Sequence, residues 1–152
     1  MKKQGLMALV LSGWSLLAQA DVVATDAWVR EVPPVSPSAA VFVSLENRGD
    51  QAVTIMRLSS PLAAAVEWHD MHHHDGMMHM QARQDIVLPA GSRHQLAPGG
   101  SHLMLVDLQR PLRVGDVVPL SLELSTRQVV TINAVVRRSE PATPARSKHH
   151  HH

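Results

Sequence analysis

Short runs of alternating apolar and polar residues, separated by turn-forming residues, extend along most of this chain. Alternation of this kind places every second side chain on the same face, which is typical of β-strands, and no long stretch shows a helical period. Many short strands at regular spacing indicate an all-β domain, either an antiparallel sandwich or a barrel. The predicted strands cover residues 22–32, 39–46, 51–58, 63–71, 77–83, 86–88, 93–96, 102–108, 117–124 and 129–136.

The turn-forming residues predict which strands are joined as hairpins. The sequence NRGD at residues 47–50 predicts a hairpin between the strands on either side of it. Asp75–Gly76 is a two-residue turn signal and predicts a second hairpin. Residues 125–127 predict a third, between the last two strands. Met56 lies alone in an apolar strand, and a lone methionine of this kind is expected in the core.

The two ends of the chain differ from this pattern. Lys2 and Lys3 precede an apolar run that ends at an A-x-A site, so residues 1–20 are predicted to be a cleaved signal peptide and the protein to be periplasmic. The alternative is an uncleaved anchor, although the run is short for a membrane span. Residues 139–152 are polar, which predicts a disordered tail. Its terminal histidines are either native metal-capturing residues or a purification tag. A single domain, 21–138, remains.

Charge and cysteine content narrow the function of this domain. The formal net charge of +1 includes Lys2 and Lys3, and without these two it falls to −1, with histidine neutral. A nearly neutral domain is a poor match for nucleic acid or for an anionic membrane surface. The chain contains no cysteine, which excludes disulfides, thiol catalysis and thiolate metal sites. A blue-copper electron carrier, which needs a cysteine ligand, is therefore excluded as well.

Histidine and methionine are concentrated between His69 and Met104. This stretch holds every histidine outside the tail and, after the signal peptide, every methionine except Met56. Histidine and methionine without cysteine form a ligand set for copper, because thioether sulfur selects Cu(I) and imidazole binds both Cu(I) and Cu(II). The pairs His69-x-Met71 and His102-x-Met104 each place two ligands on one face of a strand. Trp68 should then point to the opposite face from His69.

These residues have a specific spacing. The arrangement His69-x10-Met80-x21-His102-x-Met104 resembles the H-x10-M-x21-H-x-M signature of the periplasmic copper chaperones called PCu(A)C. The similarity continues outside the signature, and covers nearly the whole domain. The flanking matches are AWVR at residues 27–30, LENRGD at 45–50, PGGSHLM at 98–104 and RPL at 110–112.

The resemblance implies a cupredoxin-like β-sandwich that binds one Cu(I) through His69, Met80, His102 and Met104. It also implies delivery of copper to the CuA centre of an oxidase subunit, alongside a Sco-type copper protein. Met71 stands where the family often has a further methionine. The domain is expected to be a monomer, with a metal-bridged dimer as the alternative.

The loop between the first two ligands departs from the family pattern, because it is rich in histidine. Its residues could form a second site that favours Cu(II) or Zn(II) through imidazole. Asp70 and Asp75 lie in the same stretch and are expected to bind imidazoles by hydrogen bonds or to keep the loop soluble. The candidate accessory ligands are Met71, His72, His73, His74, Met77, Met78 and His79.

Two other functions compete with copper delivery. The first is a periplasmic buffer or resistance protein that sequesters Cu(II), Zn(II) or Ag(I) through the histidine-rich loop and tail. The second is a structural interaction module whose histidines bind metal only incidentally. No enzyme is predicted, because the chain lacks G-x-S-x-G, HExxH and a nucleophilic cysteine.

Overall fold

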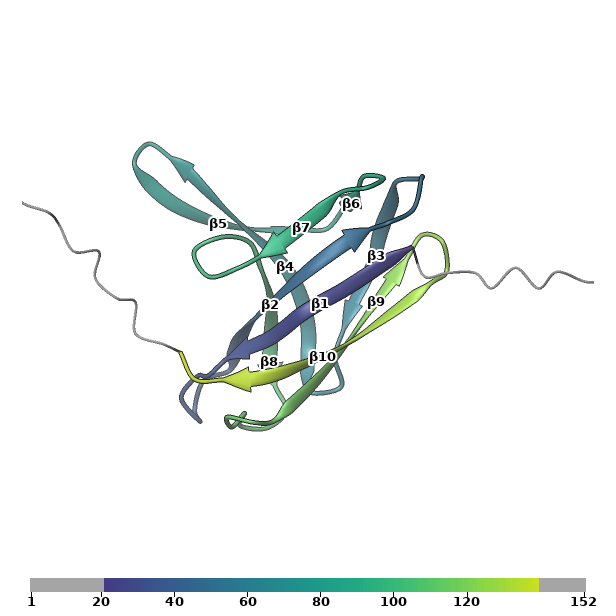
Figure 1. Cartoon of the computed structure of the whole chain (residues 1–152). Helices are drawn as coiled ribbons and strands as arrows, with labels where there is room; N and C mark the ends of the chain where they lie inside the picture. The colour runs from purple at the N-terminus through teal and green to yellow at the C-terminus, as the bar shows by residue number, and fades with distance from the viewer. Residues whose placement is uncertain (1–20, 140–152) are drawn as a thin grey trace, which may run out of the picture.

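The structure is a computed structural model that describes residues 21–139, and in that range every regular element is a β-strand (Figure 1). The part of the chain described contains no helix long and apolar enough to cross a membrane. The predictions of a signal peptide and a disordered tail lie outside these residues, apart from Ser139. The ten strands are β1 (Val22–Arg30), β2 (Ser38–Asn47), β3 (Val53–Ser59), β4 (Ala63–His74), β5 (Met77–Arg83), β6 (Ile86–Leu88), β7 (Arg93–Leu96), β8 (His102–Leu108), β9 (Val117–Leu124) and β10 (Val129–Arg137).

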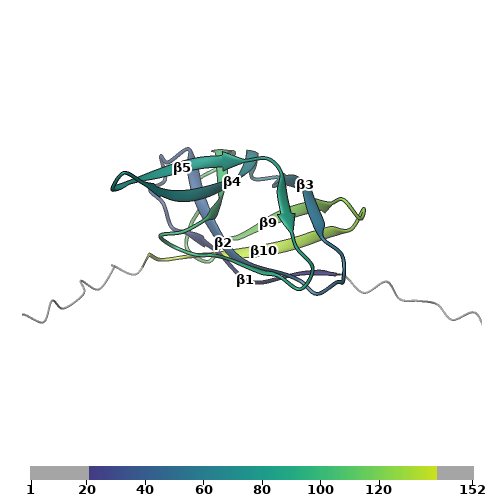
Figure 2. The ribbon, with the colours of Figure 1, turned by 90° about the horizontal axis from the view of Figure 1, so that it is seen from above.

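The ten strands form one strongly curved sheet; nine follow the order β5-β4-β8-β2-β1-β10-β9-β3-β6, and β7 pairs with β2 outside this order. The sheet folds over on itself into two layers. In Figure 2, β4 and β5 lie in the layer at the top of the picture, and β1 and β10 lie in the layer at the bottom. The inner faces of the two layers supply the apolar core, in which Leu45, Leu103 and Leu120 are almost completely buried. The all-β sandwich that the alternation predicted is therefore confirmed.

One pairing makes the sheet mixed rather than antiparallel throughout. β1 and β10 run parallel, with Trp28 opposite Val135 and Arg30 opposite Arg137. Local alternation carries no information on strand direction, since both kinds of strand bury every second side chain. The prediction of a purely antiparallel sandwich is corrected to this extent.

The hairpin predicted around residues 47–50 is wrong. β2 pairs with β1 on one edge, and its other edge is shared by β8 and β7, so no edge remains for β3. β3 pairs instead with β6 and β9. The buried Asn47 shapes the connection, because its side-chain amide donates to the carbonyl oxygens of Gln51 (2.8 Å) and Leu88 (2.9 Å). The turn therefore carries the chain across to the other layer.

Met56 is also not in the core, since 67% of its surface is exposed. The register between β3 and β9 shifts between Ile55 and Arg57, which leaves Met56 at the irregularity. Val53 and Ile55 take the buried positions of β3, so the alternation of faces itself places Met56 outside.

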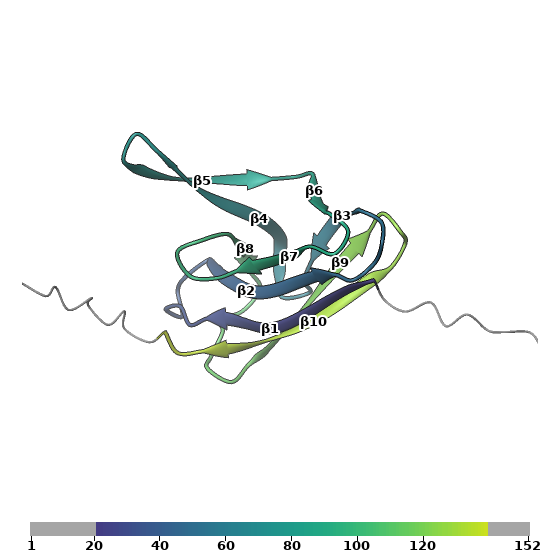
Figure 3. The same ribbon diagram turned by 45° about the horizontal axis from the view of Figure 1, so that its top comes forward.

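The two remaining hairpins are confirmed. β4 pairs with β5 and β9 with β10, both antiparallel. Asp75 and Gly76 have φ values of 52° and 74°, the left-handed conformation that a tight hairpin turn requires. β4 continues to His74, beyond the predicted end, and the β4–β5 hairpin projects past the other strands (Figure 3).

Candidate metal centre

The two histidines of the spacing lie directly opposite each other on neighbouring strands. β4 and β8 are antiparallel, and His69 is the partner of His102. Directly opposed residues point to the same face of a sheet. The ring centroids of the two imidazoles are accordingly 5.5 Å apart, with an angle of 59° between the ring planes.

The methionines lie on the two sides of this histidine pair. Met104 lies two residues beyond His102 and is opposite Glu67. Met71 lies two residues beyond His69, in the other direction, and is opposite Met80 of β5. Residues two apart on a strand share a face, so all these side chains project from one surface. Three adjacent strands therefore bring His69, Met80, His102 and Met104 to the same face.

His69 offers each ring nitrogen to a different neighbour. Its Nε2–H donates to Glu67 Oε2 at 2.8 Å, and its Nδ1 lies 3.0 Å from Met80 Sδ. A carboxylate on one nitrogen selects the tautomer and leaves the lone pair on the other nitrogen free. This lone pair and the thioether of Met80 are thus two soft or borderline donors side by side.

His102 is buried, with 7% of its surface exposed. Its Nδ1 faces the carbonyl oxygen of Gly100 at 3.3 Å, while Nε2 has no hydrogen-bond partner among the described residues. The pKa of His102 is lowered, chiefly because the imidazole is buried. The hydrogen bond to the Gly100 carbonyl raises this pKa, whereas the charges of His69 and Arg30 lower it further. The imidazole is therefore kept neutral, with one nitrogen unpaired, which is the form that ligates a metal.

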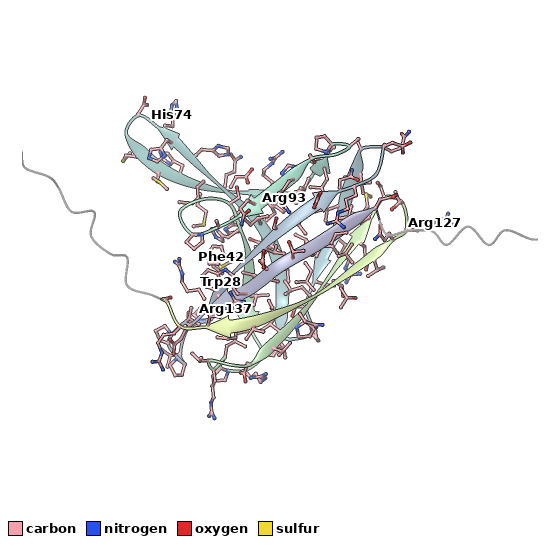
Figure 4. All side chains as sticks on the ribbon, viewed as in Figure 1. Trp28, Phe42, His74, Arg93, Arg127 and Arg137 are labelled. Carbon is pink, nitrogen blue, oxygen red and sulfur yellow. The ribbon has the colours of Figure 1, made fainter. Side chains whose placement is uncertain are left out.

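An aromatic row continues from His102 into the sheet. Phe42 lies 6.3 Å from the His102 ring and 4.7 Å from Trp28, measured between centroids. The guanidinium of Arg30 covers Phe42 at 5.2 Å. Trp28 lies on β1 and Phe42 on β2, and both are labelled in Figure 4. The two rings cover one side of His102. Trp28 and Arg30 belong to the AWVR match, but nothing in the sequence predicted a place for Phe42 beside His102.

The opposite face of β4 holds the strands of the site together. Asp70 is 8% exposed and accepts three hydrogen bonds, from Trp68 Nε1 (2.8 Å), Ser101 Oγ (2.7 Å) and Arg83 Nη1 (2.9 Å). Burial raises the pKa of its carboxyl group, but the hydrogen bonds from Ser101, Trp68 and Arg83, together with the Arg83 charge, bring the pKa below its ordinary value. Asp70 thus links β4, β5 and the residue before β8.

Two predictions concern this opposite face. Trp68 does point away from His69, with 3% of its surface exposed, as expected. The expected hydrogen bond between Asp70 and an imidazole is wrong, because the indole, hydroxyl and guanidinium donors occupy the carboxylate. Asp75 does approach an imidazole, that of His74, at 3.4 Å on the exposed turn.

The accessory candidates divide between the two faces of the hairpin. Register places Met71 opposite Met80 and His73 opposite Met78, on the face of His69. His72 is opposite His79, and His74 opposite Met77, which puts these four on the other face. In Figure 4, His74 lies at the outer end of the hairpin. Within residues 21–139 no three His, Asp or Glu side chains gather closely enough to hold a metal.

Comparison with known proteins places the chain in a family. The family model described as "Putative lipoprotein LpqE-like" matches residues 22–136, which is almost the whole described domain. The chain belongs to the LpqE-like family. One relative of this LpqE-like chain is the "Putative lipoprotein Lxx21020" of Leifsonia xyli subsp. xyli, 35% identical over 109 residues. The alignment covers 70% of this chain and 64% of that protein's length.

Solved structures with the same fold are PCuAC domains. The LpqE-like chain superposes on the apo PCuAC domain of PmoF2 with a TM-score of 0.68 and 26% identity, covering 78% of this chain and 91% of that one. The copper-bound form of that domain superposes with a TM-score of 0.65 and 25% identity, covering 79% of this chain and 95% of that one. The Cu(I) form of DR1885 from Deinococcus radiodurans superposes with a TM-score of 0.61 and 28% identity, covering 83% of each chain. The predicted cupredoxin-like fold of PCu(A)C domains is thus confirmed.

Proposed function

We propose that this LpqE-like protein is a copper chaperone that binds one Cu(I) through His69, Met80, His102 and Met104. The observation that carries the proposal is the buried, unpartnered Nε2 of His102 opposite His69, whose Nδ1 faces the Met80 thioether. A buried polar atom without a partner costs free energy, so it needs a function. A soft cation provides the missing partner for this nitrogen.

The four ligands suit a cargo that has to be released. Imidazole and thioether are both neutral, so Cu(I) keeps its charge and binding releases no proton from a methionine. His102 is buried, but 52% of the surface of Met80 is exposed. An incoming ligand can therefore replace the Met80 sulfur first, while the two histidines still hold the ion. Met71 is opposite Met80 and serves as the accessory ligand.

We further propose that the chaperone acts in the periplasm and hands copper to a CuA-containing oxidase subunit, alongside a Sco-type copper protein. The signal-like pattern of residues 1–20 supports export. The lipoprotein names of the family and of its Leifsonia relative agree with an exported protein. The copper-bound PCuAC domain and Cu(I)-DR1885 support the identity of the metal.

The test is an anaerobic Cu(I) competition titration against a chromophoric chelator, with His149 to His152 replaced by alanine so that they cannot compete. Met80→Leu and Met104→Leu should each weaken binding by about tenfold or more, equivalent to about 1.4 kcal/mol. Met56→Leu is the matched control, because Met56 is an exposed methionine on β3. Equal affinities for all four proteins would reject the four-ligand site.

A second candidate function is metal buffering. It is supported by the cross-strand pair His72 and His79, two exposed imidazoles on the face opposite the Cu(I) ligands. Two imidazoles suit Cu(II) or Zn(II) rather than Cu(I). Donation separates the two functions: a chaperone loses its copper to an apo CuA domain, whereas a buffer keeps it. Full retention of Cu(I) against that domain favours buffering.

A further inference from the structure

The face of the β4–β5 hairpin that carries Met80 does not end at the four proposed ligands. Beyond Met80 and its partner Met71, the next pair on the same face is His73 and Met78. Consecutive pairs on one face are separated by two residues, or about 7 Å along the strand. Donors of the same chemical kind therefore continue from the proposed copper site toward the turn.

These outer donors are accessible, in contrast to the two inner ligands on β8. Met78 is 46% exposed and His73 is exposed, whereas His102 is buried and Met104 is half-buried. Met80, which is 52% exposed, is the inner ligand that is open on the side of the outer donors. Phe42 lies beside the His102 ring, on the side away from β4 and β5. The open side of the site is therefore the one that faces Met80 and the projecting hairpin (Figure 3).

We propose that the outer part of the hairpin carries a second, weaker Cu(I) site, formed by His73, Met78 and Met71, and that copper enters and leaves the inner site through it. Cross-strand partners such as His73 and Met78 have Cβ atoms about 5 Å apart, and diagonal neighbours such as Met71 and Met78 about 7–8 Å. Long, flexible methionine side chains can close such distances around one ion. The proposal rests on the proposed Cu(I) function.

The transfer step consists of ligand exchange alone. A bond from copper to the Met71 sulfur forms before the bond to the Met80 sulfur breaks, and copper remains Cu(I) throughout. Neutral thioethers and neutral imidazoles donate at both sites, so no proton or electron has to move. A site with one imidazole, in which His73 and Met78 are exposed to water and Met71 is half-buried, should bind more weakly than the inner site, which has two imidazoles, one of them buried.

The hairpin contains its own control. Met77 and His72 are the sequence neighbours of Met78 and His73, but register puts them on the other face. All four side chains are exposed. A site on the Met80 face should respond to changes in Met78 and His73 and not to the same changes in Met77 and His72. If the loss of any thioether or imidazole from the hairpin were enough to change Cu(I) binding, changes in the two pairs would have the same effect.

The first experiment follows the methionine methyl groups of the full chain by NMR, with carbon-13 in the methyls, during anaerobic titration with Cu(I). The terminal histidines are replaced by alanine. The first equivalent should shift Met80 and Met104, and the second should shift Met78 and leave Met77 in place. Equal shifts of Met77 and Met78, or no response of Met78 to the second equivalent, would overturn the outer site.

The second experiment measures the rate of Cu(I) transfer from the loaded chain to the chelator bicinchoninate. The double variant His73→Ala, Met78→Leu should keep the inner affinity and slow transfer by about tenfold. The control His72→Ala, Met77→Leu should transfer at the parental rate. If both double variants transfer Cu(I) at the parental rate, the proposed path is overturned, but the inner site is not. A parent that binds no Cu(I) tightly overturns the chaperone function and the path together.

Discussion

The inner and outer parts of the β4–β5 hairpin carry the same kinds of residue in different surroundings. The inner part lies beside β8, where His69 faces a buried histidine and Asp70 ties the strands together. The outer part projects into solvent, and its residues His72–His74 and Met77–His79 are all exposed. Burial leaves a His102 nitrogen unpaired and ready for metal, whereas outer donors stay hydrated. Identical ligand types thus acquire different expected affinities from their position in the sheet.

The largest effect on this comparison should come from Asp70→Ala. The change removes the acceptor for Trp68, Ser101 and Arg83 and leaves the buried indole N–H of Trp68 unpaired. A loss of about 2–3 kcal/mol in the free energy of unfolding is expected, because each buried unsatisfied group costs about 1–3 kcal/mol. Urea denaturation measures it. Asp85→Ala is the control at an exposed position outside the left-handed region and should leave stability unchanged; equal losses in the two variants would contradict the role given to Asp70.

His102→Leu should separate function from stability. Removing a buried imidazole ligand should lower the Cu(I) affinity by about a hundredfold, or about 2.8 kcal/mol. The same change removes a buried nitrogen without a partner, so the apo fold should become more stable by about 1 kcal/mol. Competition titration and urea denaturation measure the two quantities. His94→Leu, on β7, serves as the control for affinity, and a destabilised His102→Leu protein would argue against the unpaired state of Nε2.

The stability of the apo protein should depend on pH through His102. Its pKa is lowered in the folded state, so the unfolded chain binds more protons between the folded pKa and the ordinary value near 6.5. The contribution of His102 to the free energy of unfolding is therefore complete above about pH 6.5. It is lost as the pH falls through the pKa of His102 in the folded state. Urea midpoints between pH 5 and pH 8 measure this slope. The slope should be smaller in His102→Leu, and an unchanged slope would assign it to other groups.

Glu67→Gln should have the smallest of these effects. Glu67 accepts a hydrogen bond from His69 Nε2 at 2.8 Å and so holds the tautomer whose Nδ1 faces Met80. Loss of a carboxylate partner behind a histidine ligand commonly weakens metal binding about 10- to 100-fold, and the exposure of Glu67 argues for the lower end. Competition titration of Glu67→Gln beside Glu31→Gln checks this. Equal affinities would show that His69 orients itself without Glu67.

Much of the candidate site could be predicted from the sequence because it depends on local spacing. Two His-x-Met pairs on strands, and a turn at Asp75–Gly76, are enough to expect donors on common faces. The opposite orientation of Trp68 follows from the same alternation. These predictions needed only the two-residue period of a strand and the conformational preference of a turn.

Predictions that depended on strand partners were less successful. The hairpin between β2 and β3 is wrong because β7, β8 and β1 occupy the edges of β2. Met56 is apolar, which favours the core, but Val53 and Ile55 pack into the core and so place Met56 on the outer face of β3. The partners of Asp70 come from positions 68, 83 and 101, a combination that no local pattern contains.

The sequence by itself determined which donors this protein offers, that cysteine is absent, and that most of the chain forms short strands. Only the tertiary structure decided that His69 faces His102, that Met71 and Met104 lie on opposite sides of this pair, and that His73 lies opposite Met78. The physical reason is that alternation assigns side chains to faces within one strand. Register between strands, which arises from packing of the whole core, decides which faces and which donors meet.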